Sequence, residues 1–215
     1  MKIQTEPIAS IPRPKFLVNA LNAFSQQQID KAELSKLYDE ALKDTIHRFE
    51  ETGSPVITDG EQTKPSFATY PIMGMKQLDP NGVIIPFADN HTRQLPKITA
   101  GPFRYQTYAN SYLEKAKQFT NMPVKQAVIS ASALSLLYTN VLNPGIETPE
   151  EIRDTILEAA EIIPVEQLGT TDDCGFPPFA DDTSTSRDTA FSKIASRIKG
   201  TRRAEEALNK KQIAV

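Results

Sequence analysis

Val56-Ile57-Thr58-Asp59-Gly60-Glu61 is the stretch that decides the fold of this chain. It opens with β-branched residues, which favour a strand, and it ends with acidic residues around a glycine. A helix is predicted just before it, because apolar residues recur at three-and-four spacing over 34–49 until Gly53 and Pro55 stop the pattern. A helix that passes at once into a buried strand is typical of alternating β/α proteins. We therefore expect the acidic side chains at the C-terminal end of a strand.

The same alternation continues on both sides of this stretch. Further strands are predicted at residues 8–14, 123–129 and 168–171. Further helices are predicted at residues 104–119, from Thr148 onward, and around 191–198. Thr148 begins its helix with a capping box, because proline follows it and glutamate stands three residues later. The order predicts an α/β fold with a parallel sheet, outer helices and a site at the strand ends.

One segment departs from the alternation. Residues 65–97 are rich in proline and turn formers, and Asn81-Gly82 stands between two apolar runs. Asn-Gly tolerates the positive φ angles of a tight two-residue turn. We therefore predict a β-hairpin excursion from the main fold over 65–97, with the runs on either side of Asn81-Gly82 paired to each other.

Composition limits the class of protein. The chain has 215 residues, 39% of them hydrophobic and 24% charged, with a net charge of −3, which gives no reason to expect nucleic acid as a partner. No apolar run is long enough to span a membrane, and the start of the chain carries no secretion signal. A single cysteine fits a reducing cytosol, so a cytoplasmic location is expected. The basic tail at 201–215 predicts a solvated helical end, with an anionic partner as the alternative.

Four segments together resemble the cobalamin-independent methionine synthase family, in the order in which that family carries them. They are residues 8–14, 58–62, 123–137 and 147–179. The resemblance implies a single partial barrel domain over 1–215, in which 1–138 resembles barrel units one to three and 144–200 resembles the last helix-strand-helix. The fold class expected is an incomplete TIM-type (β/α) barrel of about four parallel strands with outer helices. A complete barrel typically needs about 250 residues, and the middle strands have no counterpart here.

The resemblance also implies a chemistry and the residues that perform it. The family transfers a methyl group to the thiol of homocysteine, with a methylated folate as donor in the full-length enzymes, so an S-methyltransferase of the 5-methyltetrahydropteroyltriglutamate–homocysteine type is expected. Ile8, Ser10 and Glu61 would bind the amino acid substrate, with Glu61 holding its ammonium group. Cys174 would bind zinc, which removes the thiol proton of the substrate and leaves a thiolate ready for methylation.

The sequence departs from the family at the metal. The family adds a His-x-Cys pair and a glutamate to the last cysteine, but neither His47 nor His91 is followed by such a cysteine. Three hypotheses remain open. The chain is a zinc-dependent methyltransferase of impaired activity, with a substitute site at Cys174, Asp172 or Asp173, and His91. Alternatively, it is a non-catalytic deletion product or degenerate relative that self-associates into a homo-oligomer. A different thiol substrate or a decarboxylation is a third possibility.

Overall fold

The structure is a computed structural model. It describes residues 2–67, 69–79, 81–82, 84–86, 92–94, 96–100, 106–128, 146–161, 164–165, 168–171, 176 and 185–213.

Parallel strand segments form the centre of the fold. β1 (Gln4–Glu6) pairs in parallel with β6 (Gly169–Thr171), the last strand among the described residues. A second parallel contact is an isolated bridge between Ile57 and Val124. The described residues therefore show the predicted parallel pairing in a mixed α/β fold. They show short strands and no closed barrel.

Hydrogen bonds connect these two parallel pairs into one row. The backbone N–H of Ile11 donates to the carbonyl of Gly60 at 3.0 Å, and the hydroxyl of Thr58 donates to the carbonyl of Ala9 at 2.9 Å. The segment after β1 thus runs beside the segment after Ile57. The spatial order is β6, β1, the Ile57 segment and the Val124 segment.

The first strand lies earlier in the chain than predicted. The sequence placed it at residues 8–14, whereas the paired residues are those of β1, at 4–6. Residues 8–14 include Pro12 and Pro14, which lack an N–H and cannot continue a ladder. That segment therefore contacts its neighbours through single hydrogen bonds instead of a regular sheet.

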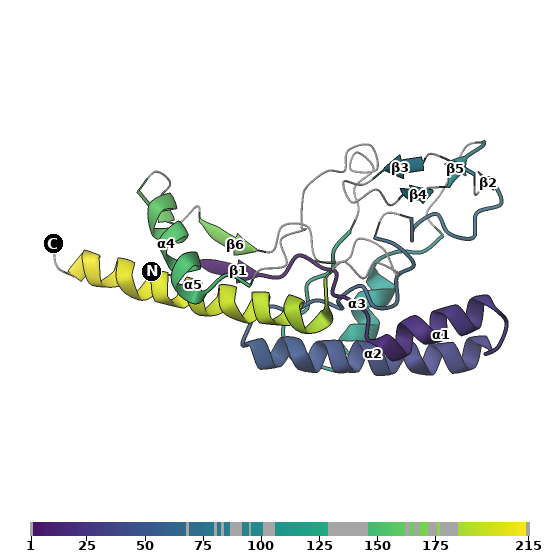
Figure 1. Ribbon diagram of the computed structural model, residues 1–215, viewed down its shortest axis with the longest axis horizontal. Helices are drawn as coiled ribbons and strands as arrows, with labels where there is room; N and C mark the ends of the chain where they lie inside the picture. Colours follow the sequence, from purple (N-terminus) through teal and green to yellow (C-terminus); the bar gives the residue numbers. More distant parts are fainter. Residues whose placement is uncertain are drawn as a thin grey trace.

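Two long helices pack on the strand row, and Figure 1 shows the longer one beneath β1 and β6. α2 (Lys31–Thr52) ends at Gly53, whose φ of 71° is the left-handed cap that the sequence predicted. α5 (Arg187–Ile213) continues through most of the basic tail, so the helical end predicted there is confirmed. The main apolar core lies between these helices and the strands. Its buried residues are Ile11, Leu42, Ile46, Phe49, Ile57, Ala116, Phe176, Ala190, Phe191, Ile194 and Ile198.

The described residues form three further, shorter helices. α4 (Pro149–Ala159) begins with the predicted capping box at Thr148 and packs on α5. α3 (Asn110–Ala116) is shorter than the helix predicted at 104–119. α1 (Lys15–Ser25), which the sequence analysis did not predict, lies against α2 and shares a small apolar core with it.

The excursion is antiparallel, but its strands pair differently from the prediction. β2 (Leu78–Asp79) pairs with β5 (Lys97–Ile98), and β3 (Ile84–Pro86) pairs with β4 (Thr92–Gln94). Asn81-Gly82 therefore stands between β2 and β3, which are not partners. The hairpin predicted across Asn81-Gly82 is wrong, because each flanking segment pairs with a later part of the chain.

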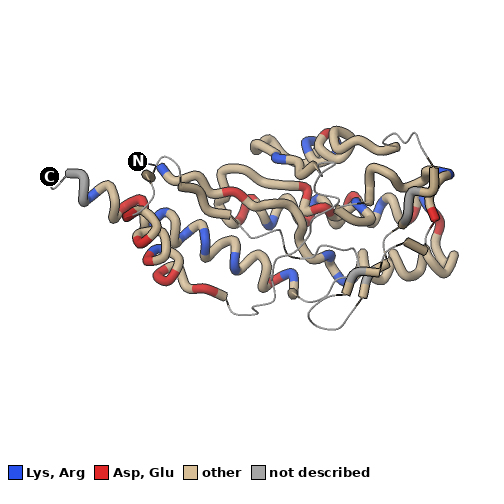
Figure 2. Tube along the Cα trace, turned by 90° about the horizontal axis from the view of Figure 1, so that it is seen from above, with Lys and Arg blue, Asp and Glu red and all other residues tan. Residues whose placement is uncertain are grey.

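Ion pairs support the packing of α4 on α5. Figure 2 shows acidic residues of α4 beside basic residues of α5. Lys193 pairs with Glu147 at 3.0 Å, just before α4, and Arg203 pairs with Glu150 in its first turn. Part of the charge of the basic helix is thus neutralised within the chain.

Gly200 sets how closely α4 approaches α5. A Cβ built at Gly200 would lie 2.6 Å from Cβ of Ile152 and 2.9 Å from the carbonyl oxygen of Pro149. Gly200→Ala should therefore lower the free energy of unfolding by about 1–3 kcal/mol, although alanine favours helix more than glycine does. Urea denaturation measures the change. The matched control is Lys199→Ala, at an exposed position of the same helix, and equal stability of the two variants would contradict the packing argument.

Candidate functional site

A tight turn follows the Ile57 segment and contains two consecutive residues with positive φ. Gly60 has a φ of 62°, and Glu61 has a φ of 54°, a conformation that non-glycine residues rarely adopt. A side chain at position 60 would not fit, because a Cβ there would lie 2.6 Å from Cγ2 of Thr45 in α2. The glycine lets the chain turn against α2 and places Glu61 at the C-terminal end of the strand row.

Arg13 holds this turn in place. Its guanidinium donates to the carbonyls of Glu61 at 3.0 Å, Gln62 at 3.1 Å and Lys64 at 2.5 Å. The amide of Gln62 in turn donates to the carbonyl of Ile11 at 2.8 Å. These bonds join the segment after β1 to the turn after Ile57, so two strand ends are fixed relative to each other.

A buried ion pair lies within the turn. Nζ of Lys64 is 2.8 Å from Oε1 of Glu61, and the two side chains are 0% and 8% exposed. The same ammonium donates to the carbonyl of Ala127 at 3.0 Å, just beyond the Val124 segment. It also lies 4.8 Å from the ring centre of Tyr70 and 5.5 Å from that of Tyr112. Carboxylate, carbonyl and aromatic faces thus form a receptor for an ammonium group.

The surroundings of the pair disfavour charge. Burial raises the pKa of Glu61 above its ordinary value of 4.5, and the positive charge of Lys64 opposes that rise. Burial also raises the pKa of Tyr112 to about 12, so its hydroxyl stays protonated at neutral pH. Asp59 lies beside the pair and accepts a bond from the backbone N–H of Glu61 at 3.0 Å and one from Gln126 at 3.2 Å.

The structure places the predicted substrate residues as follows. Glu61 is buried at the strand ends, and Ser10 is buried in the neighbouring segment, where its carbonyl accepts from the N–H of Phe176 at 3.1 Å. Ile8 is half-buried in the same segment. The segment of Ile8 and Ser10 and the turn of Glu61 are therefore adjacent, while substrate contact by these residues stays a prediction. Cys174 lies outside the described residues.

The sequence analysis did not identify the partners of Glu61. Lys64 follows it by three residues, a spacing that brings side chains together in a helical turn, but no helix was expected there. Tyr112 lies in the stretch where a helix was predicted, at residues 104–119. Its ring meets that of Tyr70 edge-on at 5.6 Å. The position of Lys64, between the Glu61 carboxylate and the two tyrosine rings, is set by the folded turn and was not predicted from the sequence.

The described residues do not assemble a metal site. Among them, no group of three or more histidine, cysteine, aspartate or glutamate side chains is close enough to hold an ion. His47 lies on α2 with a side chain 69% exposed and contacts Glu51 at 3.4 Å. His91, Asp172 and Asp173 lie outside the described part, as Cys174 does. The residues expected to bind zinc therefore lie outside what the structure describes, so the zinc site stays a prediction.

None of the helices in the described part of the chain has the length and apolar character needed to cross a membrane.

Comparison with known proteins supports the fold and not a sequence family. No protein-family model matches the sequence, and no curated protein matches it. Among solved structures, the chain is similar to a B12-independent methionine synthase from Shewanella sp. W3-18-1, determined in complex with selenomethionine. The TM-score is 0.71 at 14% sequence identity, with 100% of each chain covered. At this identity the likeness shows that the two chains share a fold.

The buried pair generates a prediction about stability. Lys64→Met leaves the Glu61 carboxylate buried without its counter-charge and should lower the free energy of unfolding by about 3–5 kcal/mol. The double variant Glu61→Gln/Lys64→Met removes both charges and should lose much less. Chemical denaturation at pH 7 measures both. The matched control is Lys115→Met, which breaks a half-exposed pair with Asp39 and should cost under about 1 kcal/mol.

The raised pKa of Glu61 also predicts how the free energy of unfolding depends on pH. Because the pKa of Glu61 is higher in the folded chain than its ordinary value of 4.5, the folded state binds more protons above that pH. The stability of the natural chain relative to the double variant should therefore fall as the pH rises above 4.5. A difference that stays constant or grows with pH would contradict the assigned burial of Glu61.

Proposed function

We propose that the chain binds homocysteine or a similar amino thiol at Glu61 and takes part in methyl transfer to that thiol. The observation that carries the proposal is the buried carboxylate at the strand ends, which already binds an ammonium group, that of Lys64. The shared fold with a B12-independent methionine synthase bound to selenomethionine supports the same class of ligand.

One oxygen of Glu61 is available to a ligand. Lys64 occupies Oε1, and within the described residues Oε2 has no hydrogen-bond partner. A carboxylate oxygen has room for more than one donor, so a substrate ammonium could bind Oε2 while Lys64 keeps Oε1. Lys64 and Arg13 would then keep the loop rigid during binding, which limits the entropy lost when the ligand is ordered.

The second part of the proposal concerns the thiol of the substrate and how it is ionised. A free thiol is little ionised at neutral pH and reacts slowly with a methyl donor. We propose Cys174 as a ligand of zinc that would ionise the substrate thiol, with a methylated folate as the donor. The further ligands of that zinc are not among the residues that the structure describes.

Recognition of the ammonium can be tested with a pair of ligands. Homocysteine and 4-mercaptobutanoate share a thiol and a carboxylate, and only homocysteine carries an ammonium. Calorimetry should give homocysteine an affinity at least about tenfold higher, since a charge-assisted hydrogen bond contributes about 1.5–3 kcal/mol. Glu61→Gln should remove that difference.

The matched control is Glu158→Gln, at an exposed position of α4, which should keep the preference. If Glu61→Gln fails to fold, the comparison of the two ligands on the natural chain still tests recognition of the ammonium group. Equal affinities for homocysteine and 4-mercaptobutanoate would contradict ammonium recognition by Glu61.

Zinc content separates catalysis from the second candidate, a non-catalytic chain that associates with itself. That candidate is favoured by apolar side chains that are exposed in the described part of the chain, Val128 at 63% and Ile146 at 48%. Zinc bound one per chain and lost in Cys174→Ser is the result expected for the methyltransferase. A folded, metal-free oligomer in light scattering that binds no homocysteine would favour the second candidate.

A further inference from the structure

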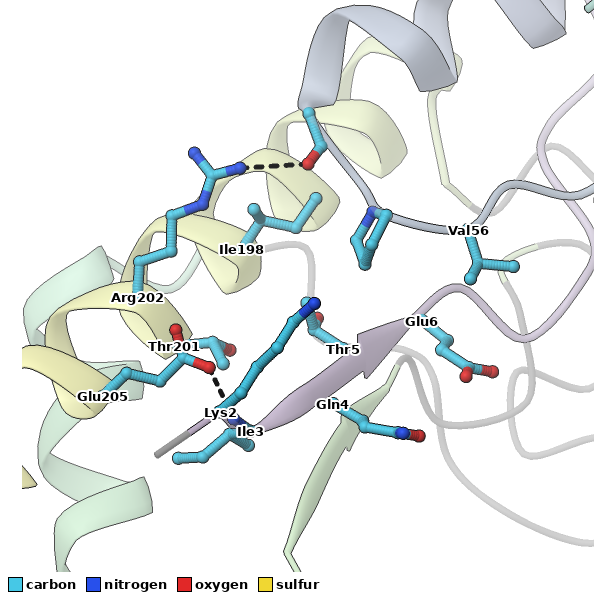
Figure 3. Close-up of a pocket in the computed structure, with 12 residues that line it drawn as sticks. Lys2, Ile3, Gln4, Thr5, Glu6, Val56, Ile198, Thr201, Arg202 and Glu205 are labelled. Atoms are coloured by element: carbon cyan, nitrogen blue, oxygen red, sulfur yellow. Dashed lines mark hydrogen bonds between the residues drawn. The ribbon is translucent and has the colours of Figure 1, made fainter. Parts of the chain in front are cut away.

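A pocket of about 360 Å³ lies at the opposite end of the strands from Glu61. Residues 2–6 line one side of it, at and before β1, and Gly53, Pro55 and Val56, before the Ile57 segment, line another. The C-terminal half of α5 forms its third side, with Ile198, Thr201, Arg202 and Glu205. Figure 3 shows Lys2 extending from the chain that leads into β1 and Arg202 extending from α5.

The charges of the pocket do not balance. Glu6 pairs with Lys125 at 2.9 Å, whereas Glu205 has no ion-pair partner in the described part of the chain and accepts a bond from the backbone N–H of Ile3 at 2.5 Å. Within the described residues Lys2 has no ion-pair partner. Arg202 donates to the carbonyl of Gly53 at 3.1 Å and pairs with no carboxylate in that part of the chain. The lining therefore has two cations and one carboxylate without an ion-pair partner among the described residues, so its net charge is positive.

A buried hydroxyl in the pocket wall also lacks a partner. Thr5 is 8% exposed, and its Oγ1 is buried without a hydrogen bond in the described part of the chain. Leaving a buried hydroxyl unpaired costs about 1–3 kcal/mol, so such groups are rare in folded proteins. An anionic oxygen bound in the pocket would accept a hydrogen bond from it.

Part of the remaining lining is apolar. Ile3 and Ile198 are buried core residues that face the pocket, and Pro55 and Val56 add further hydrocarbon surface. A volume of this size is within the range of small-molecule sites. Cationic groups, an unpaired hydroxyl and an apolar wall together match a ligand with an anionic head and a short hydrocarbon body.

We propose that this pocket binds a small organic anion, a carboxylate or a phosphate monoester with a short aliphatic chain. Lys2 and Arg202 bind the anionic oxygens, the hydroxyl of Thr5 donates to one of them, and Ile3, Val56 and Ile198 contact the aliphatic part. The site is independent of the amino thiol site proposed at Glu61, because it lies at the other end of the strands.

Calorimetry with hexanoate, hexyl phosphate and hexylammonium tests the proposal on the full chain. At least one of the two anions should bind one per chain, and hexylammonium should bind at least about tenfold more weakly because its charge is opposite. The anion with the higher affinity identifies the head group. Lys2→Gln and Arg202→Gln should each weaken that anion about tenfold, as expected for loss of a charge-assisted hydrogen bond.

Matched variants keep the result interpretable. Lys199→Gln makes the same charge change at an exposed position of α5 outside the pocket, and it should leave affinity unchanged. Thr5→Val should weaken the anion while keeping or raising the melting temperature, because it removes an unpaired hydroxyl. If Arg202→Gln unfolds the chain, the affinity of Lys2→Gln for the anion is the test of the proposal. The proposal is overturned if neither anion binds, or if Lys2→Gln and Lys199→Gln bind it equally well.

Discussion

Two opposite charges buried side by side, on Glu61 and Lys64, hold the strand ends of this chain together. Separately, each charge would be expensive to bury, but together they neutralise each other at 2.8 Å. Through Ala127, Lys64 reaches the Val124 segment, and through the backbone bonds of Arg13 the same turn is joined to the segment after β1. One ion pair and one guanidinium thus connect three strand ends that have few ladder bonds between them.

α5 performs a similar task along the length of the strands. Arg197, buried in this helix, donates to the carbonyl of Glu6 at 2.6 Å and to that of Thr170 at 2.9 Å, so it bridges β1 and β6. Arg187, at the start of the helix, donates to the carbonyl of Pro12 at 2.8 Å. Helix-borne arginines therefore compensate for short strands by satisfying backbone carbonyls that a longer sheet would pair.

Local signals in the sequence predicted structure well, and non-local ones did not. Gly53 and Thr148 mark helix ends, because caps are bonds between near neighbours in the chain. α1 was not predicted, because its N-cap residue is Pro14, which makes no side-chain hydrogen bond and so gives no capping signal in the sequence. Asn81-Gly82 suggested a turn between partners, but β2 and β3 found their partners further along the chain. At the site, the acidic residues at the strand end were predicted from the sequence. The contact of Lys64 with Glu61 was not, because it depends on a turn with positive φ at Gly60 and Glu61 that no spacing rule describes.

The central claim is that the Glu61 carboxylate binds two ammonium groups, that of Lys64 at Oε1 and that of a substrate at Oε2. The most direct test is a crystal structure of the chain with homocysteine. The account predicts the ligand nitrogen about 3 Å from Oε2 of Glu61, with Lys64 still bonded to Oε1. Homocysteine bound elsewhere, or bound with its nitrogen far from Glu61, would contradict it.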